Sequence, residues 1–225
     1  MNILYYGHSC IGITINGIYL LIDPFITPNP KAAHLDIASI KADYILITHA
    51  HYDHIMDVEF FAQRDQSMII SNHEIVQYYD RLGIKGHAMN PGGSFSFPFG
   101  TLKVVHAIHS SSFPDGTYGG NPCGFIIESN GKTIYIAGDT ALSLDMKLIP
   151  MFHQLDLAVL SIGGNYTMDV NEAVVAADFL QCNKILGVHY DTAELITIDH
   201  KKAQEKFANH GKELILLEIG ADLDV

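Results

Sequence analysis

The sequence predicts a layered α/β protein with β-sheets inside and helices outside. Two segments of similar design, residues 10–23 and 123–139, each contain two apolar, β-branched runs around an Asn-Gly pair. In the rest of the chain, short apolar runs alternate with longer helix-patterned stretches. Strand-rich halves need helices to cover the outer faces of their sheets. No Pro- or Ser-rich linker divides the 225 residues, so we expect one domain spanning residues 1–225.

The Asn-Gly pairs are the clearest local signals. Asn16-Gly17 and Asn130-Gly131 suit the type I′ turn, in which both central residues need a positive φ. Each pair therefore predicts a β-hairpin, and in both segments the second strand runs into an aspartate, Asp23 or Asp139. Two hairpins of one plan, about half a chain apart, predict two pseudo-repeated halves.

Hydrophobic periodicity predicts the remaining elements. The apolar N-terminus indicates an immediate strand, and residues 27–30 and 110–122 are rich in loop-forming residues, which makes them candidate walls of a site. Further strands are expected at residues 44–48, 68–71, 102–107, 155–161, 184–188 and 214–217. Helices are expected at residues 57–63, 73–82, 144–152, 170–180 and 200–210.

Charge and composition argue against nucleic-acid binding, secretion, membrane insertion and a disulfide framework. The formal net charge of −12 disfavours nucleic acid as a partner, because a nucleic-acid binder must neutralise closely spaced phosphates. The first basic residue is Lys31, so the N-terminus lacks the positive start of a secretory signal. Apolar runs are too short for an integral membrane segment, and the three cysteines are too widely spaced for a disulfide framework. We expect a cytoplasmic protein.

One string of residues carries the chemistry. The chain has thirteen histidines, and the predicted strand at 44–48 runs directly into His49-Ala50-His51-Tyr52-Asp53-His54. Residues two apart in an extended segment point the same way, so His49 and His51 can hold one metal ion, while Asp53 and His54 face a second. The alternative is a polar loop that happens to be rich in histidine. A chance HxHxDH is expected only about 0.003 times in a chain of this composition.

Thr48 and the string His49–His54 resemble the THxHxDH signature of the metallo-β-lactamase superfamily. This resemblance implies a four-layer αββα sandwich made of two similar halves. It also implies three later ligands, which match the histidine in Ala107-Ile108-His109-Ser110, the aspartate in Gly138-Asp139-Thr140 and the histidine in Gly187-Val188-His189-Tyr190.

Carried over by position, the resemblance implies that His49, His51 and His109 hold one ion. Asp53, His54 and His189 would hold the other, with the carboxylate of Asp139 bridging the two. His106 is an alternative to His109, but it falls within the predicted strand at 102–107, where a core or supporting imidazole is expected. Asp23 is expected to brace the ligand loop without being a ligand itself.

Two further strings narrow the resemblance. Gly7-His8-Ser9 and the segment at 161–168 are similar to a branch of short metal-dependent hydrolases related to ascorbate-6-phosphate lactonases and the phospholipase D that cleaves N-acyl-phosphatidylethanolamine. His8 would contact substrate or a metal-bound group, although a lone histidine beside glycine also suits a structural role. The predicted substrate-binding residues are His8, Ser110 and Tyr166. Six other histidines are expected at the surface or in the core: His34, His73, His87, His153, His200 and His210.

Such a site implies hydrolysis. Two divalent ions, Zn first and Mn or Fe as alternatives, would share a bridging hydroxide that attacks the substrate. Asp53 would orient the hydroxide and carry its proton, with His8 as a second candidate catalytic residue. No GxSxG elbow supports a serine nucleophile. The expected substrate is a small or medium ester, lactone or phosphodiester.

Two other functions fit the same residues. One is an iron-dependent sulfur (persulfide) oxygenase on the same fold, which would use fewer of these ligands. The other is a non-catalytic metal-binding protein. The residues leave the physiological substrate, the native metal and the oligomeric state open, and a homo-oligomer is compatible with them.

Overall fold

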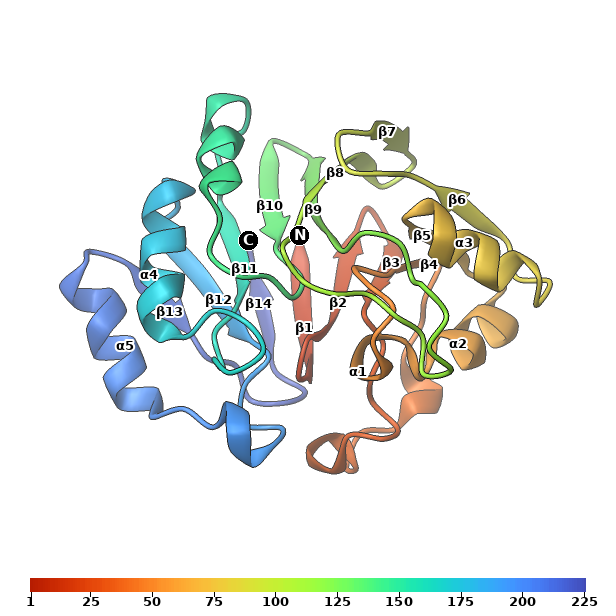
Figure 1. Ribbon diagram of the computed structural model, residues 1–225, viewed down its shortest axis with the longest axis horizontal. Helices are drawn as coiled ribbons and strands as arrows, with labels where there is room; N and C mark the ends of the chain where they lie inside the picture. Colours follow the sequence, from red (N-terminus) through yellow and green to blue (C-terminus); the bar gives the residue numbers. More distant parts are fainter.

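Two seven-stranded sheets form the centre of the protein in the computed structural model, which describes residues 1–225 (Figure 1). The first sheet contains, in spatial order, β14 (Asp222–Asp224), β1 (Asn2–Gly7), β2 (Cys10–Ile15), β3 (Ile18–Ile22), β4 (Tyr44–Leu46), β5 (Met68–Ser71) and β6 (Gly86–Ala88). The second contains β13 (Glu213–Ile215), β12 (Lys184–Val188), β11 (Leu157–Ser161), β10 (Lys132–Ile136), β9 (Cys123–Ser129), β8 (Gly100–His106) and β7 (Ser94–Phe97).

The two sheets share one plan, as the hairpins predict. In the first, β2 and β3 pair antiparallel, and β4, β5 and β6 then follow β3 in parallel. In the second, β9 and β10 pair antiparallel, and β11, β12 and β13 then follow β10 in parallel. Both Asn-Gly turns have positive φ angles, 54° and 78° at Asn16 and Gly17 and 54° and 73° at Asn130 and Gly131.

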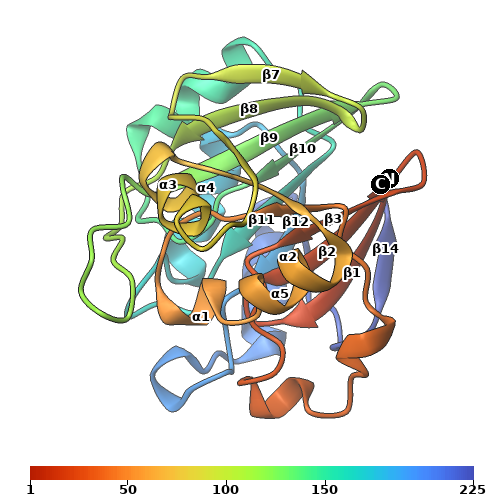
Figure 2. The ribbon, with the colours of Figure 1, turned by 90° about the vertical axis from the view of Figure 1, so that its right-hand side faces the viewer.

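Helices cover the outer face of each sheet, so the chain forms four layers (Figures 1 and 2). The first sheet is covered by α1 (Tyr52–Ile55), α2 (Val58–Asp65) and α3 (His73–Asp80). The second is covered by α4 (Val170–Phe179), α5 (His200–Asn209) and the 3₁₀ helix η3 (Leu144–Met151). Three shorter 3₁₀ helices lie in loops: η1 (Pro30–Ala32), η2 (Ile37–Ser39) and η4 (Glu194–Ile196).

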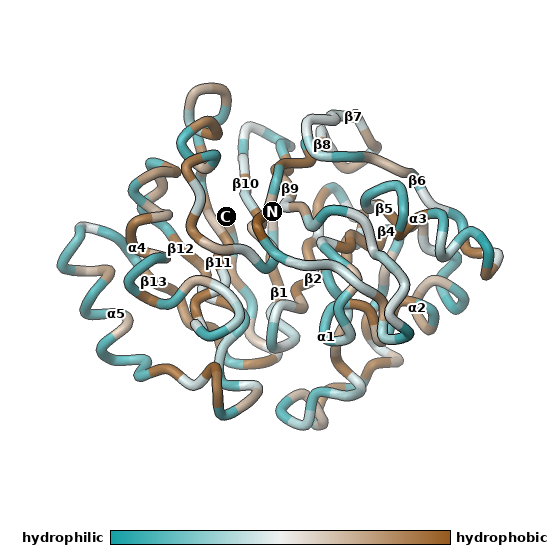
Figure 3. The backbone as a smooth tube through the Cα atoms, viewed as in Figure 1, coloured by the Kyte–Doolittle hydropathy of each residue, from teal (hydrophilic) through white to brown (hydrophobic).

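Three apolar layers hold these elements together. The middle layer lies between the sheets and includes Ile13 from β2 and Phe125 from β9. A second layer, which includes Phe207, packs between the second sheet and its helices. A third, which includes Phe61, packs between the first sheet and its helices. Figure 3 shows a related pattern, with apolar residues along strands such as β11 and β12 and mainly polar residues along α5. The mixed α/β class and the layered architecture are therefore confirmed.

Most predicted elements are present, but the helix at residues 144–152 is wrong in type. Residues 144–151 form the 3₁₀ helix η3, which contains Pro150. Proline has no N–H and clashes with the preceding turn, which disfavours regular α-helix there. The short strands β6, β7 and β14 were not predicted, because three or four residues carry too little periodicity to be recognised.

The candidate site lies where strands of both sheets end. His8 and His109 follow β1 and β8, and Asp23 and Asp139 follow β3 and β10. Because parallel strands point the same way, their carboxyl ends lie side by side along one end of each sheet. His49 follows β4 at this end of the first sheet, and His189 follows β12 at the corresponding end of the second.

Candidate metal centre

The string that follows β4 changes from strand to helix within a few residues. His49 is completely buried, and His51, in extended conformation, precedes the first residue of the four-residue helix α1. This turn lets Asp53 and His54 face the same side as the two preceding histidines. The carbonyl of Thr48 accepts a hydrogen bond from the N–H of Cys123 at 3.0 Å, so the string is joined to the second sheet.

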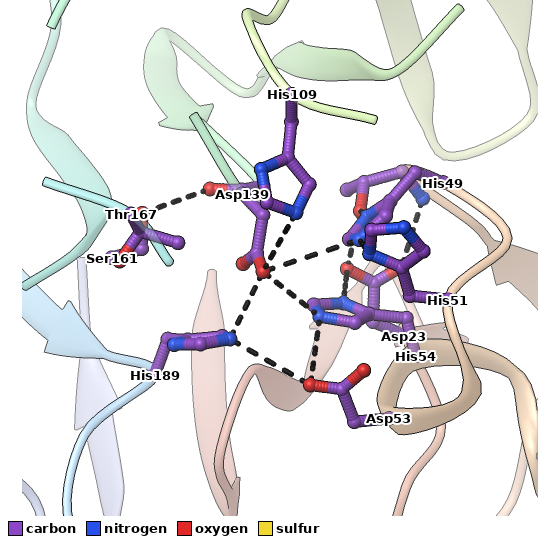
Figure 4. A network of polar contacts seen from close by, with 12 residues as sticks. Asp23, His49, His51, Asp53, His54, His109, Asp139, Ser161, Thr167 and His189 are labelled. Carbon is purple, nitrogen blue, oxygen red and sulfur yellow. Dashed lines mark hydrogen bonds and ion pairs between the residues drawn. The ribbon is translucent and has the colours of Figure 1, made fainter. Parts of the chain in front are cut away.

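The structure brings all seven predicted ligands together, as Figure 4 shows. One group consists of His49, His51 and His109. A second consists of Asp53, His54 and His189, joined by His8, and Asp139 lies with His49 and His54 in a third. Within each group the candidate ligand atoms all lie within 4.8 Å of one another.

Asp139 lies between two sets of candidate ligands: His49, His51 and His109 form one set, and Asp53, His54 and His189 form the other. Its Oδ2 atom is 2.9 Å from Nε2 of His189 and 3.3 Å from Nε2 of His54. The same oxygen is 3.7 Å from Nε2 of His109 and 4.0 Å from Nε2 of His49. A carboxylate in this place can contribute to both sets at once.

Hydrogen bonds to surrounding residues orient the candidate ligands. Asp23 accepts from Nδ1 of His54 at 2.9 Å, which leaves Nε2 of His54 turned to the centre. Asp23 also accepts from the hydroxyl of Thr48 at 2.7 Å, so that this hydroxyl can accept from Nδ1 of His49 at 2.9 Å. The hydroxyl of Ser110 lies 3.2 Å from Nε2 of His51, which leaves Nδ1 of His51 for the centre. The contacts of Asp23 agree with the bracing role expected for it.

The protonation pattern differs between the two sets. Burial lowers the pKa values of His49, His51 and His109, so these imidazoles are neutral and have free lone pairs. Burial would also lower the pKa of His189, but the Asp139 carboxylate raises it to about 9. For His54, too, Asp139 and Asp23 override burial and raise the pKa well above its usual value.

The carboxylates show the complementary shifts. Burial would raise the pKa of Asp139, yet His189 and His54 hold it well below its usual range. Asp53 behaves similarly, because contacts with His189 and His8 outweigh its burial. In the metal-free protein, protons on His54 and His189 therefore supply the positive charge that these two carboxylates require.

Unsatisfied buried atoms support the fit to cations. Nε2 of His54 and Oδ1 of Asp139 are buried without a hydrogen-bond partner. Buried polar atoms are rarely left without one, and each orphan calls for an explanation such as an ion. Imidazole nitrogen and carboxylate oxygen are ligands of Zn and other first-row metals. The donor set fits divalent cations.

The remaining predicted residues occupy different positions. His8 is only 4% exposed, and burial lowers its pKa to about 4. The Ser110 hydroxyl contacts His51, and Tyr166 is exposed in the turn after β11, where its hydroxyl makes no hydrogen bond. His106, for which a core or supporting position is expected from the sequence, is exposed and not in the core. Its half-exposed ring points away from the centre toward Asp145, 3.6 Å away.

The six other histidines lie outside the metal-binding groups. None is in the core, because each is exposed or partly exposed: His34, His73, His87, His153, His200 and His210. Two of them have acidic partners at the surface, Asp191 for His200 at 2.6 Å and Glu128 for His153 at 2.7 Å.

Sequence reasoning missed two residues that shape the site. Thr192 lies 2.9 Å from Nδ1 of His8, and no motif marks it. Asn72 donates to the carbonyl groups of Gly119 and Asn121 and so holds the loop that follows His109. A signal for Asn72 was present, since it stands between β5 and α3 at a helix-capping position and accepts from the N–H of Ile75.

None of the helices combines the length and the apolar character that a membrane-spanning segment requires.

Comparison with known proteins places the chain in a family. A family model described as Beta-lactamase superfamily domain matches residues 19–190. UPF0173 metal-dependent hydrolases of Flavobacterium johnsoniae and Christiangramia forsetii are 56% and 53% identical to the chain, with 100% of each chain covered. The solved structure of Igni18, a novel metallo hydrolase from Ignicoccus hospitalis, aligns with a TM-score of 0.90 at 32% identity, covering 100% of this chain and 98% of that one. The resemblance found in the Thr48–His54 string is thus confirmed, and the chain belongs to the metallo-β-lactamase superfamily and, within it, to the UPF0173 metal-dependent hydrolases.

Proposed function

We propose that the protein is a hydrolase with a binuclear metal centre that cleaves a small or medium ester, lactone or phosphodiester. The observation that carries this proposal is the convergence of seven donors, two sets of three with Asp139 between them. A single-ion site needs three or four donors. Seven donors with a central carboxylate suit two ions better than one.

The donors divide by charge as well as by position. His49, His51 and His109 would hold one cation through neutral imidazoles, and Asp53, His54 and His189 would hold the other. Asp139 is 3% exposed and within 4.0 Å of both sets, so it is the natural bridge. Histidine-rich sites of this kind suit Zn, with Mn or Fe as alternatives.

A pair of divalent cations, when bound, polarises a carbonyl or phosphoryl oxygen and lowers the pKa of water to about 7. Asp53 is the protein group best placed to move protons. Its side chain is 35% exposed, whereas Asp139 is almost sealed from solvent. A carboxylate open to the substrate side can orient the attacking water and deliver a proton to the leaving group.

Apolar side chains next to the ligands favour substrates with an uncharged portion. Tyr52, which precedes Asp53 in the sequence, is 48% exposed, and Ile108, which precedes His109, is 47% exposed. Exposed apolar groups at the rim of a site provide binding surface for esters and lactones. Ser110 and Tyr166 remain proposed substrate contacts. Both sheets contribute to one centre, so we also propose that residues 1–225 act as one catalytic domain.

The test combines metal analysis with activity. The purified protein, loaded with Zn or Mn, is assayed with bis(4-nitrophenyl) phosphate, a 4-nitrophenyl ester and a γ-lactone. We expect about two metal ions per chain and turnover of at least one probe. Asp53→Asn is expected to lower kcat strongly while part of the metal is retained.

Two outcomes would contradict the proposal. One iron per chain, with oxygen consumed when a persulfide is supplied, would favour the sulfur oxygenase. Stoichiometric metal without turnover of esters, lactones or phosphodiesters would favour a metal-binding protein without catalysis. His153→Ala, a surface change outside the metal-binding groups, is the matched control and should leave metal content unchanged.

A further inference from the structure

We propose that Thr192 and His8 are positioning residues that hold the carboxylate of Asp53 in its working orientation. This inference rests on the proposed function and deepens it. Oγ1 of Thr192 lies 2.9 Å from Nδ1 of His8, and Nε2 of His8 lies 2.8 Å from Oδ2 of Asp53. The three side chains thus form one hydrogen-bonded chain that ends on a candidate metal ligand.

The direction of the hydrogen bonds follows from the groups involved. An ionised carboxylate only accepts, so Nε2 of His8 must carry a proton and donate it to Asp53. Nδ1 of the neutral ring is then an acceptor, and the hydroxyl of Thr192 donates to it. This hydroxyl also lies 3.4 Å from the carbonyl of Tyr190, a longer and weaker alternative. Thr192 thereby donates to the nitrogen that the Asp53 contact leaves unprotonated, and so anchors the ring in the orientation that holds Asp53.

The backbone also holds His8 in place. His8 and His189 both have positive φ angles, 55° and 57°, and the N–H of His189 donates to the carbonyl of His8 at 2.9 Å. The hydroxyl of Tyr5 donates to the same carbonyl at 3.2 Å. The ring centroids of His8 and His189 lie 4.2 Å apart, and the ring of Phe25 packs edge-on against His8 with a centroid distance of 5.5 Å. These contacts fix the backbone and the ring position of His8, and the contact with Thr192 adds a hydrogen bond at Nδ1.

Thr192 is also where solvent can reach this chain of contacts. A cavity of about 580 Å³ borders His8, Thr192 and Tyr190 and is lined further by Lys31 and His200. Thr192 is only partly buried, whereas His8 is almost fully buried. The cavity therefore borders both the threonine and the ring that it orients.

The hydrogen bond from His8 makes the two carboxylate oxygens of Asp53 different. Oδ2 is held by His8 and lies 3.7 Å from both His54 and His189, whereas Oδ1 makes no hydrogen bond. Fixing Oδ2 sets the plane of the carboxylate and directs Oδ1. If the hydroxyl of Thr192 is lost, Nδ1 of His8 loses its hydrogen-bond donor, the imidazole is anchored at one end only, and the hydrogen bond from Nε2 no longer holds Oδ2 of Asp53 in one orientation.

The experiment uses the full chain and replaces Thr192 with a near-isosteric residue. Thr192→Val removes only the hydroxyl, Thr192→Ser keeps it, and Thr197→Val removes an exposed hydroxyl of the same loop that contacts only the carbonyl of Ala193. Each variant is titrated with Co²⁺, and its dissociation constants and visible absorption spectrum are measured. Thr192→Val is expected to weaken binding of one Co²⁺ about tenfold and to alter the spectrum. Thr192→Ser and Thr197→Val should match the wild type.

A double-variant cycle separates positioning from simple structural damage. His8→Asn tolerates the positive φ but is too short to join Thr192 to Asp53. If Thr192 acts through His8, Thr192→Val should have no additional effect on Co²⁺ affinity or on kcat in the His8→Asn background. Thermal unfolding of the metal-free variants checks that they fold.

Three results would overturn the inference: a wild-type Co²⁺ spectrum and affinity in Thr192→Val, equal losses in Thr192→Ser and Thr192→Val, or additive losses in the double variant. A wild-type protein that binds no Co²⁺ would overturn both this inference and the proposed function. If the wild type binds Co²⁺ but cleaves no probe, the proposed function fails, while affinity and spectrum still decide whether Thr192 is a positioning residue.

Discussion

Asp23 and His54 are 31 residues apart in sequence, yet Oδ2 of Asp23 accepts a hydrogen bond from Nδ1 of His54 at 2.9 Å. Both side chains are essentially without exposure to solvent. The contact connects the end of the first hairpin to the ligand string and selects the tautomer of His54 whose Nε2 faces the centre.

We therefore expect Asp23→Asn to weaken metal binding about tenfold to a hundredfold. Asparagine tolerates the positive φ of 47° at this position, so the backbone can be retained. Metal dissociation constants measured by competition with a chromophoric chelator check this expectation. An unchanged dissociation constant would show that Asp23 has no part in orienting His54.

His106 and His109 offer a matched pair of substitutions. His109→Ala should remove about one metal ion per chain, because its imidazole belongs to the first metal-binding group. His106→Ala should leave metal content and turnover unchanged, because its ring is half exposed and faces Asp145. Elemental analysis of both variants decides between the two histidines, and loss of metal from His106→Ala would contradict the assignment.

Stability of the metal-free protein should depend on pH through His189. Asp139 overrides burial and raises the pKa of His189 to about 9, above its value of about 6.5 in an unfolded chain. A raised pKa contributes stability that is fully present below about pH 6.5 and is lost as the pH rises through about 9. His54, with a pKa shifted in the same direction, contributes with the same sign.

Urea unfolding of chelator-treated protein measures this effect. The free energy of unfolding should fall as the pH is raised from about 6.5 to 9. His189→Asn should flatten the profile, and so should saturating Zn, because a coordinated imidazole has already lost its proton. A rise in stability over the same range would contradict the assigned protonation of the metal-free centre.

Asn72 should be important for the loop after His109. Its side chain donates to Gly119 and Asn121 and caps α3 by accepting from Ile75. Losing a cap and two buried hydrogen bonds costs roughly 2–4 kcal/mol, so Asn72→Ala should lower the free energy of unfolding by about that amount. Limited proteolysis should then cut within residues 110–122. Wild-type resistance to protease would show that the loop is held by other contacts.

Local chemistry made much of the fold predictable. The turns at Asn16-Gly17 and Asn130-Gly131 and the run from His49 to His54 lie in contiguous residues, so their pattern is visible in the sequence. The helix ends were also predictable within one or two residues, for example at α4, where Asp169 and Glu172 form a capping box. The apolar spacing at residues 144–152 predicts an α-helix, but Pro150 disfavours regular α-helix there, and the segment forms the 3₁₀ helix η3.

The contacts that orient the ligands were less accessible. Thr192 touches His8 across 184 residues, and Ser110 touches His51 across 59 residues. A single hydroxyl leaves no periodic signal, and its partner depends on how loops from the two sheets pack. Sequence patterns therefore predicted the residues that carry metal-binding groups and one residue that orients them, Asp23, whereas the contacts of Thr192 and Ser110 required three-dimensional structure.

The repeated hairpin has a consequence for how the protein matures. Equivalent aspartates close the two hairpins, but Asp23 braces a histidine while Asp139 faces the centre between the two sets of donors. Neither half of the chain contains a full complement of donors, because His49 to His54 come from one sheet and Asp139 and His189 from the other. The full set of seven donors is therefore assembled only after synthesis has passed β12 and the two sheets have closed on each other. Ions held by these donors would join loops from both sheets, so complete loading would come late in the maturation of each newly made molecule.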